Sequence, residues 1–199
     1  MISAKSNVIR RRTLGYEQIL VTDELSTSVQ WASGIPFRRH ETLGELVKAM
    51  AAQRGICRPE DLITEEPTRH EVKVDGRVMH TFCFVDALML PFMLQGGPVA
   101  VRSRSPSSGH VTAHVTEEGI VSSPSGAVVS FGAARAEDGP THTTLCPYLN
   151  VFPSRDDYER WAERTPQADT VALSMEEAFD LARDWISHPA GGSGGICRC

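Results

Sequence analysis

The chain has 199 residues, of which 41% are hydrophobic and 23% are charged, and its formal net charge is −5. This length is enough for one domain whose core needs no disulfide bonds. The acidic balance excludes a broad basic surface for nucleic acid or for an anionic membrane, because the only basic cluster is a short run at residues 10–12.

The cysteine content indicates a reducing compartment. The first residues lack the apolar core of a signal peptide, and no apolar run approaches the ~20 residues of a membrane span. The number of cysteines is odd, and their spacings differ from those of secreted disulfide scaffolds. We therefore expect a cytoplasmic protein whose thiols are available for metal or catalytic chemistry. These are Cys57, Cys83, Cys146, Cys197 and Cys199.

The first half of the chain is expected to contain two helices, a turn and short helical piece at residues 57–66, and a hairpin. The first 40 residues show no clear periodicity. Residues 40–55 place Leu43, Leu46 and Met50 on one helical face. Residues 71–80 predict a β-hairpin around the two-residue turn Asp75-Gly76. The next segment, "HTFCFVDALMLPFML" at residues 80–94, is helical by length and composition until Pro91 disturbs it.

The second half alternates strands and helices. Strands are expected at residues 98–104, 110–116, 127–131 and 169–173. Residues 141–152 are expected to be extended or looped, since Pro147 disfavours a helix at Cys146. Helices are expected at residues 154–164, with Ser154 as N-cap, and at 174–187, where Ser174 and Glu177 have capping-box spacing.

The predicted fold class is therefore α+β, with mixed or antiparallel strands, flanking helices and a small helical N-terminal part. We divide the chain into an N-terminal helical region (residues 1–68), a main domain (69–189) and a flexible glycine-rich tail (190–199) that ends in a Cys-x-Cys pair.

Cys83 and Asp86 place a thiol and a carboxyl group three residues apart within an apolar run. Positions three apart share one face of a helix, so the two groups can address one ligand. With Thr81 as N-cap, Cys83 lies in the first turn, where the helix dipole favours a thiolate. An apolar setting raises the pKa of Asp86 and suits it to proton transfer. By spacing alone, a structural role for both residues stays open, since cysteine is often a small buried hydrophobe.

Three segments resemble the organomercurial (alkylmercury) lyases. "HTFCFVDALMLPFML" resembles the active-site helix of that family, and "TLCPYLNVFPSRDDYERWA" resembles its second cysteine segment. "VALSMEEAFDLARDW" is similar to its last strand and helix, and the order of the segments is the same. Residues 69–185 carry the resemblance, whereas the N-terminal part is only a loose and shorter echo of the family's helical first region.

The resemblance implies two catalytic thiols, Cys83 and Cys146, and a proton-transferring carboxyl group, Asp86. Some members have a further cysteine, taken as structural, where this chain has Ser105. The implied reaction is protonolysis of a carbon–mercury bond, which yields a hydrocarbon and Hg(II). Thiolates suit the soft mercury atom, and the acid delivers the proton to carbon. No organic cofactor is expected. The implied partners are organomercurial small molecules, cellular thiols and mercuric reductase as a candidate acceptor of Hg(II), with neither nucleic acid nor membrane.

Several other residues are candidates for a metal site or for a structural role. His110 and His114 lie on one face of an expected strand and could join a cysteine in a metal site, although surface histidines are the simpler interpretation. Cys57 is expected to be structural. Cys197 and Cys199 form a candidate second thiol pair for Hg(II). Two alternative functions stay open: a relative that binds another metal or haem for biosynthesis or delivery, and a thiol-based metal-sensing regulator.

Overall fold

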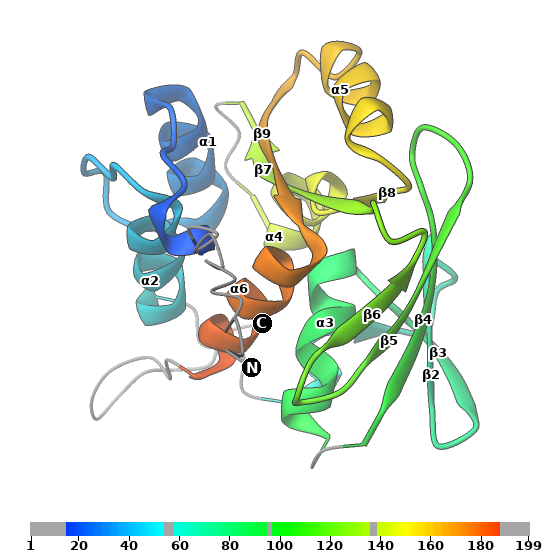
Figure 1. Ribbon diagram of the computed structural model, residues 1–199. Helices are drawn as coiled ribbons and strands as arrows, with labels where there is room; N and C mark the ends of the chain where they lie inside the picture. The colour runs from blue at the N-terminus through cyan, green and yellow to red at the C-terminus, as the bar shows by residue number, and fades with distance from the viewer. Residues whose placement is uncertain (1–14, 54–57, 95–96, 136–138, 188–199) are drawn as a thin grey trace, which may run out of the picture.

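The computed structural model describes residues 15–53, 58–94, 97–135 and 139–187. This part of the chain contains two antiparallel sheets and several helices that pack against them, which confirms the α+β prediction (Figure 1). The larger sheet has the order β1-β3-β2-β4-β5-β6. Its strands are β1 (Ile63–Thr64), β2 (His70–Val74), β3 (Arg77–Thr81), β4 (Val99–Arg104), β5 (His110–Val115) and β6 (Ile120–Ser123).

The smaller sheet has the order β8-β7-β9. Its strands are β7 (Val128–Ala134), β8 (Val151–Phe152) and β9 (Ala168–Ser174). The α-helices are α1 (Asp23–Ser33), α2 (Leu43–Gln53), α3 (Phe84–Met93), α4 (Thr141–Thr144), α5 (Arg155–Glu163) and α6 (Met175–Ser187). Short 3-10 turns are η1 (Tyr16–Gln18), η2 (Pro59–Asp61) and η3 (Cys146–Tyr148). None of the described helices is both long and apolar enough to cross a membrane.

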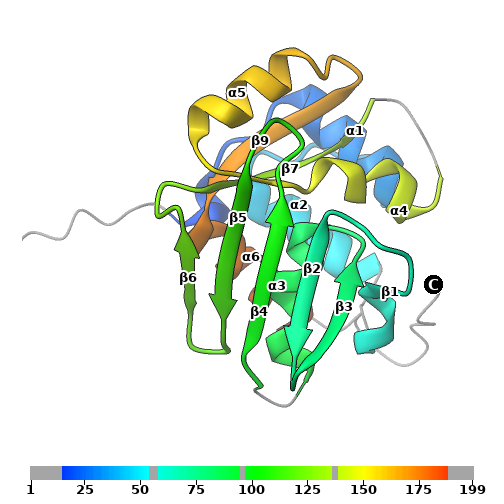
Figure 2. The same ribbon diagram turned by 90° about the vertical axis from the view of Figure 1, so that its right-hand side faces the viewer.

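The larger sheet buries one face and exposes the other. In β4, Val99, Val101 and Ser103 are buried, while the residues between them are exposed. This alternation follows from the two-residue period of a strand. The buried face packs against α3, which in turn packs against α6, as Figure 2 shows behind the strands. The helix that carries Cys83 and Asp86 is thus fixed between a sheet and a second helix.

The predicted hairpin is present, with β2 and β3 joined by Asp75 and Gly76. Both turn residues have positive φ angles, 47° and 82°. A two-residue turn of this kind matches the right-handed twist of the strands, which explains the aspartate–glycine pair. The hairpin places Thr81, the last residue of β3, directly before the site helix.

Helix α1 was not predicted from the sequence. It begins at the N-cap Thr22, whose side chain accepts a hydrogen bond from the Leu25 N–H at 3.1 Å, and ends at Gly34 with φ 63°. It packs on β7 and β9, and its apolar residues join a continuous core that also includes α2, α3 and α6. Strand β6, at the edge of the larger sheet, was also missed.

The prediction for residues 141–152 was wrong in part. The segment contains α4 and η3 before the extended β8. Pro147 lies in the first turn of η3, where its missing N–H leaves no hydrogen bond unmade. Pro91 likewise does not end α3, which continues to Met93. Packing against α6, including ring contact between Phe92 and Phe179 at 5.4 Å, supports the helix past the proline.

Candidate active site

Cys83 is itself the N-cap of α3, which corrects the expectation that Thr81 caps the helix and that Cys83 lies in the first turn. The Cys83 sulfur accepts a hydrogen bond from the Asp86 N–H at 3.4 Å. In return, Asp86 Oδ2 accepts the Cys83 N–H at 2.9 Å. This reciprocal arrangement is a capping box in which a thiol takes the place of the usual hydroxyl. The spacing of three residues therefore fixes both side chains at once.

Two further contacts hold the beginning of α3. The Thr81 hydroxyl donates to the Cys83 carbonyl at 2.8 Å, and the Phe84 N–H donates to the Leu149 carbonyl at 3.0 Å. The second bond joins the helix directly to the segment that follows Cys146. Residues that are more than 60 positions apart in the sequence are therefore brought to one place by a backbone contact.

The Cys146 segment is shaped by Ser130, a buried residue of β7. The Ser130 hydroxyl donates to the Tyr148 carbonyl at 2.7 Å and accepts the Asn150 N–H at 3.0 Å. The Asn150 side chain then donates to the Pro147 carbonyl at 2.5 Å. These bonds close the turn that begins at Cys146 and hold it on the central strand of the smaller sheet.

The three residues implied by the resemblance lie together. Ligand atoms of Cys83, Asp86 and Cys146 are all within 4.8 Å of one another, and both cysteines are free thiols. This is the only such group of three potential metal ligands among the described residues. Cys83 is fully buried, whereas Cys146 and Asp86 each retain 9% of their surface. Two soft donors and one acid are thus available to a single bound atom.

Burial controls the protonation of the site. It raises the pKa of Asp86 to about 7, although hydrogen bonds from the Cys83 side chain and backbone lower it. Burial also raises the pKa of Cys83 well above its usual value, with further contributions from the hydrogen bond to Cys146 and the charge of Asp86. The expected raised carboxyl pKa is confirmed. The expected thiolate at Cys83 is wrong, because desolvation outweighs the helix dipole.

A pocket of about 310 Å³ opens beside Cys146. It lies where β2 begins and β4 ends, next to the Cys146 turn. Its lining includes Arg69, His70, Phe82 and Arg104, none of which was a candidate from the sequence. No sequence motif indicates that these residues line a pocket. They are brought together only in the folded chain, where the start of the hairpin meets the end of β4.

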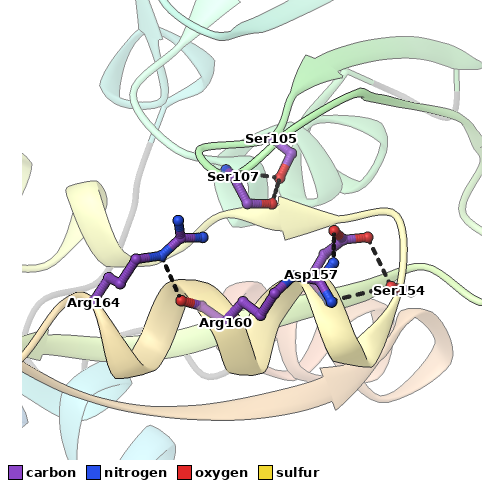
Figure 3. A network of polar contacts seen from close by, with 6 residues as sticks. All are labelled: Ser105, Ser107, Ser154, Asp157, Arg160 and Arg164. Carbon is purple, nitrogen blue, oxygen red and sulfur yellow. Dashed lines mark hydrogen bonds and ion pairs between the residues drawn. The ribbon is translucent and has the colours of Figure 1, made fainter.

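The other sequence candidates lie apart from this group. His110 and His114 are exposed on one face of β5, and neither belongs to the group of ligands described above. Ser105 is buried, and its hydroxyl contacts the Ser107 hydroxyl at 3.0 Å in a network that faces α5 (Figure 3). Cys57 and the Cys197–Arg198–Cys199 tail lie outside the described residues.

Comparison with known proteins shows the family of the chain. The sequence profile of the alkylmercury lyase family, MerB, matches residues 63–187, which is well over half of the chain. The chain belongs to the alkylmercury lyase family. The match includes Cys83, Asp86 and Cys146 and leaves out α1 and α2.

Individual relatives carry the same name. The chain is 32% identical over 123 residues to an alkylmercury lyase of Streptomyces lividans and 33% identical over 123 residues to one of Bacillus cereus. Each alignment covers 61% of this chain and 55% of the relative, so the chain spans about half the length of these curated relatives.

The fold is also similar to a solved structure. A crystal structure of the mercury-bound form of MerB2 superimposes with a TM-score of 0.55 at 19% identity. The superposition covers 72% of this chain and 73% of that one. This likeness supports the architecture of the two sheets and their helices.

Proposed function

We propose that this protein is an organomercurial lyase that cleaves carbon–mercury bonds by protonolysis. The observation that carries the proposal is the gathering of two free thiols and one carboxyl group within 4.8 Å, in a chain of the alkylmercury lyase family. A site that only stores or delivers a metal gains nothing from a proton carrier, which argues against a carrier or a sensor. Cys83, Asp86 and Cys146 are the proposed site residues, and mercury is substrate and product.

Accessibility suggests the order of the two thiols. Cys146 lines the pocket and Cys83 has no exposed surface. We therefore assign the first step to Cys146: its sulfur replaces the thiolate that an organomercurial carries in the cell, and its proton leaves with that thiolate. This exchange produces an organomercury group bound to Cys146, next to the buried thiol and carboxyl group.

The second step breaks the carbon–mercury bond. Asp86 as carboxylate takes the proton of the Cys83 thiol, and the Cys83 sulfur then binds mercury. The electron pair of the carbon–mercury bond moves to carbon, which receives the proton from Asp86. The products are a hydrocarbon and Hg(II) held by Cys83 and Cys146, with no change of oxidation state. A pKa near 7 suits Asp86 to both halves of this transfer.

The environment of the site supports the same chemistry. Both cysteines belong to the same hydrophobic core as Val85 and Leu88 of α3, and this apolar setting restricts the access of water. We propose that no organic cofactor takes part, since two thiols and one acid supply all the bonds and protons. We further propose a reducing cytoplasm as the setting. Cellular thiols would then remove Hg(II) by exchange, and mercuric reductase is a candidate acceptor.

The direct test is product formation from phenylmercury. Purified protein with excess 2-mercaptoethanol should release benzene, measured by gas chromatography, in equal amount to Hg(II). The control is the doubly substituted Cys83→Ser, Cys146→Ser protein under the same conditions. Benzene release no faster than in that control, from a wild-type protein shown to be folded by circular dichroism, would overturn the proposal.

A further inference from the structure

The pocket beside Cys146 carries positive charge in an acidic protein. The chain has 25 acidic and 20 basic residues, yet the pocket lining contains two arginines, Arg69 and Arg104, and no aspartate or glutamate. The two residues lie side by side, because the Arg104 N–H donates to the Arg69 carbonyl at 2.8 Å where the ladder of β2 and β4 ends. Two positive charges placed together in the pocket beside Cys146 favour the binding of an anion.

Neither guanidinium forms an ion pair with a carboxylate in the part of the chain that the structure describes. Among the described residues, no carboxylate lies within 4.0 Å of Arg69 or Arg104, although six other arginine–carboxylate pairs are present in that part of the chain. Burial and the neighbouring Arg104 also lower the pKa of Arg69. The positively charged form of Arg69 is therefore destabilised by its surroundings, and a bound anion would stabilise it.

Three other polar side chains of the pocket form hydrogen bonds within the protein. The Thr68 hydroxyl donates to the Thr81 carbonyl at 2.8 Å, and the Asn150 amide donates to the Pro147 carbonyl at 2.5 Å. His70, which is buried, bonds through Nδ1 to the Ser103 hydroxyl at 2.7 Å. The two guanidiniums are thus the positively charged donors that the pocket offers to a ligand.

We infer that Arg69 and Arg104 form a subsite for a carboxylate carried by the mercury compound while its mercury atom is bound at Cys146. A guanidinium binds a carboxylate through paired, charge-assisted hydrogen bonds, which gives both affinity and orientation. The inference rests on the proposed lyase function and specifies its substrate class. The carboxylate has two possible sources: the organic group, as in 4-carboxyphenylmercury, or the thiol bound to mercury, as in an adduct with 3-mercaptopropionate.

A matched control lies on the same strand. Arg102 is two residues before Arg104 in β4 and is exposed on the same face of the sheet. It is paired in register with Glu71 of β2, and it does not line the pocket. The substitution Arg102→Gln therefore removes the same charge from nearly the same place without altering the proposed subsite.

The experiment compares kcat/KM for carboxylated and neutral substrates in two arms. The first arm uses 4-carboxyphenylmercury against phenylmercury, both with 2-mercaptoethanol. The second arm uses phenylmercury with 3-mercaptopropionate against phenylmercury with 2-mercaptoethanol. We expect the wild type to prefer the carboxylated form by about tenfold in one arm, and that arm identifies the source of the carboxylate.

The variants decide whether the arginine pair causes the preference. The doubly substituted Arg69→Gln, Arg104→Gln protein should lose the preference for the carboxylated form, and Arg102→Gln should keep this preference. A wild type that cleaves phenylmercury without preference in either arm, or a double variant that keeps the ratio, would refute the subsite and leave the lyase function standing. Equal loss in Arg102→Gln would also refute it, in favour of a general charge effect. Absence of phenylmercury cleavage by the wild type would instead overturn the lyase function and the subsite with it.

Discussion

The two thiols of the site are held by different kinds of structure. Cys83 is the cap of α3, fully buried, and bonded to Asp86 through a reciprocal pair of hydrogen bonds within one turn of helix. Cys146 begins the short 3-10 turn η3 and borders a pocket. Its turn is held by Ser130 of β7, which donates to the Tyr148 carbonyl. The first arrangement suits a protected thiol with its own proton acceptor. The second suits a thiol that meets the incoming substrate.

The largest expected effect comes from removing either thiol. Cys83→Ser and Cys146→Ser should each abolish benzene release with the fold intact by circular dichroism, because a hydroxyl is a hard, poorly ionised ligand for mercury. The two variants should differ in capture. With equimolar phenylmercury, mass spectrometry should find the Cys83→Ser protein still carrying the organomercury group, and the Cys146→Ser protein largely free of it.

Two results would contradict the roles assigned to Cys83 and Cys146. A serine variant that retains more than about a tenth of wild-type turnover would remove that cysteine from the mechanism. Equal capture by both single variants would show that the pocket does not select Cys146 for the first step.

Asp86→Asn should separate mercury binding from bond cleavage. The amide can still accept the Cys83 N–H but cannot relay a proton, so we expect kcat to fall by about 10²–10⁴ with mercury binding retained. The matched control is Asp157→Asn in α5. Asp157 holds the same helical position and bonds to its own cap, Ser154, at 2.7 Å. Undiminished kcat for Asp86→Asn at saturating phenylmercury would show that solvent or thiol supplies the proton.

The same substitution should change how stability depends on pH. The pKa of Asp86 is about 7 in the folded protein against an ordinary 3.8, so the folded state binds this proton more tightly than the unfolded state. The stabilisation is therefore complete below about pH 4 and is lost as the pH rises through 7. Relative to Asp86→Asn, the wild type should lose about 2–4 kcal/mol over this interval, measured by urea unfolding. Parallel stability curves for the two proteins would contradict the raised pKa.

The smallest effect is expected at the support of the Cys146 turn. Ser130→Ala removes the donor to the Tyr148 carbonyl and the acceptor for the Asn150 N–H, so we expect a loss of about 1–3 kcal/mol in the free energy of unfolding. Single-turnover cleavage should slow as well, because Cys146 would be held less firmly. Ser122→Ala, whose hydroxyl bond lies at the surface, should have little effect on either quantity. Equal rates for the two variants would show that the turn does not depend on Ser130.

Several elements could be predicted from local sequence patterns, and others could not. The hairpin at Asp75-Gly76 and the caps at Ser154 and Ser174 were predicted and are present, since each depends on residues that are near in sequence. Helix α1 was missed because polar residues on its buried side weaken the apolar pattern. These are Ser26, Ser28, Gln30 and Ser33. Ser28 donates to the distant Asp169 at 2.6 Å, whereas Gln30 and Ser33 donate to carbonyls one turn earlier in the same helix.

Within the site, the pairing of Cys83 with Asp86 follows from the sequence, because a spacing of three residues at a helix start brings a cap and its partner together. The sequence also indicates Cys146 as the second catalytic thiol, though only through resemblance to the lyase family. The tertiary structure alone decided that the second thiol reaches the first, that burial keeps Cys83 protonated, and that Arg69 and Arg104 border the entrance. Those features arise where β2, β4 and the turn after α4 meet, and contacts between distant segments leave no local pattern in the chain.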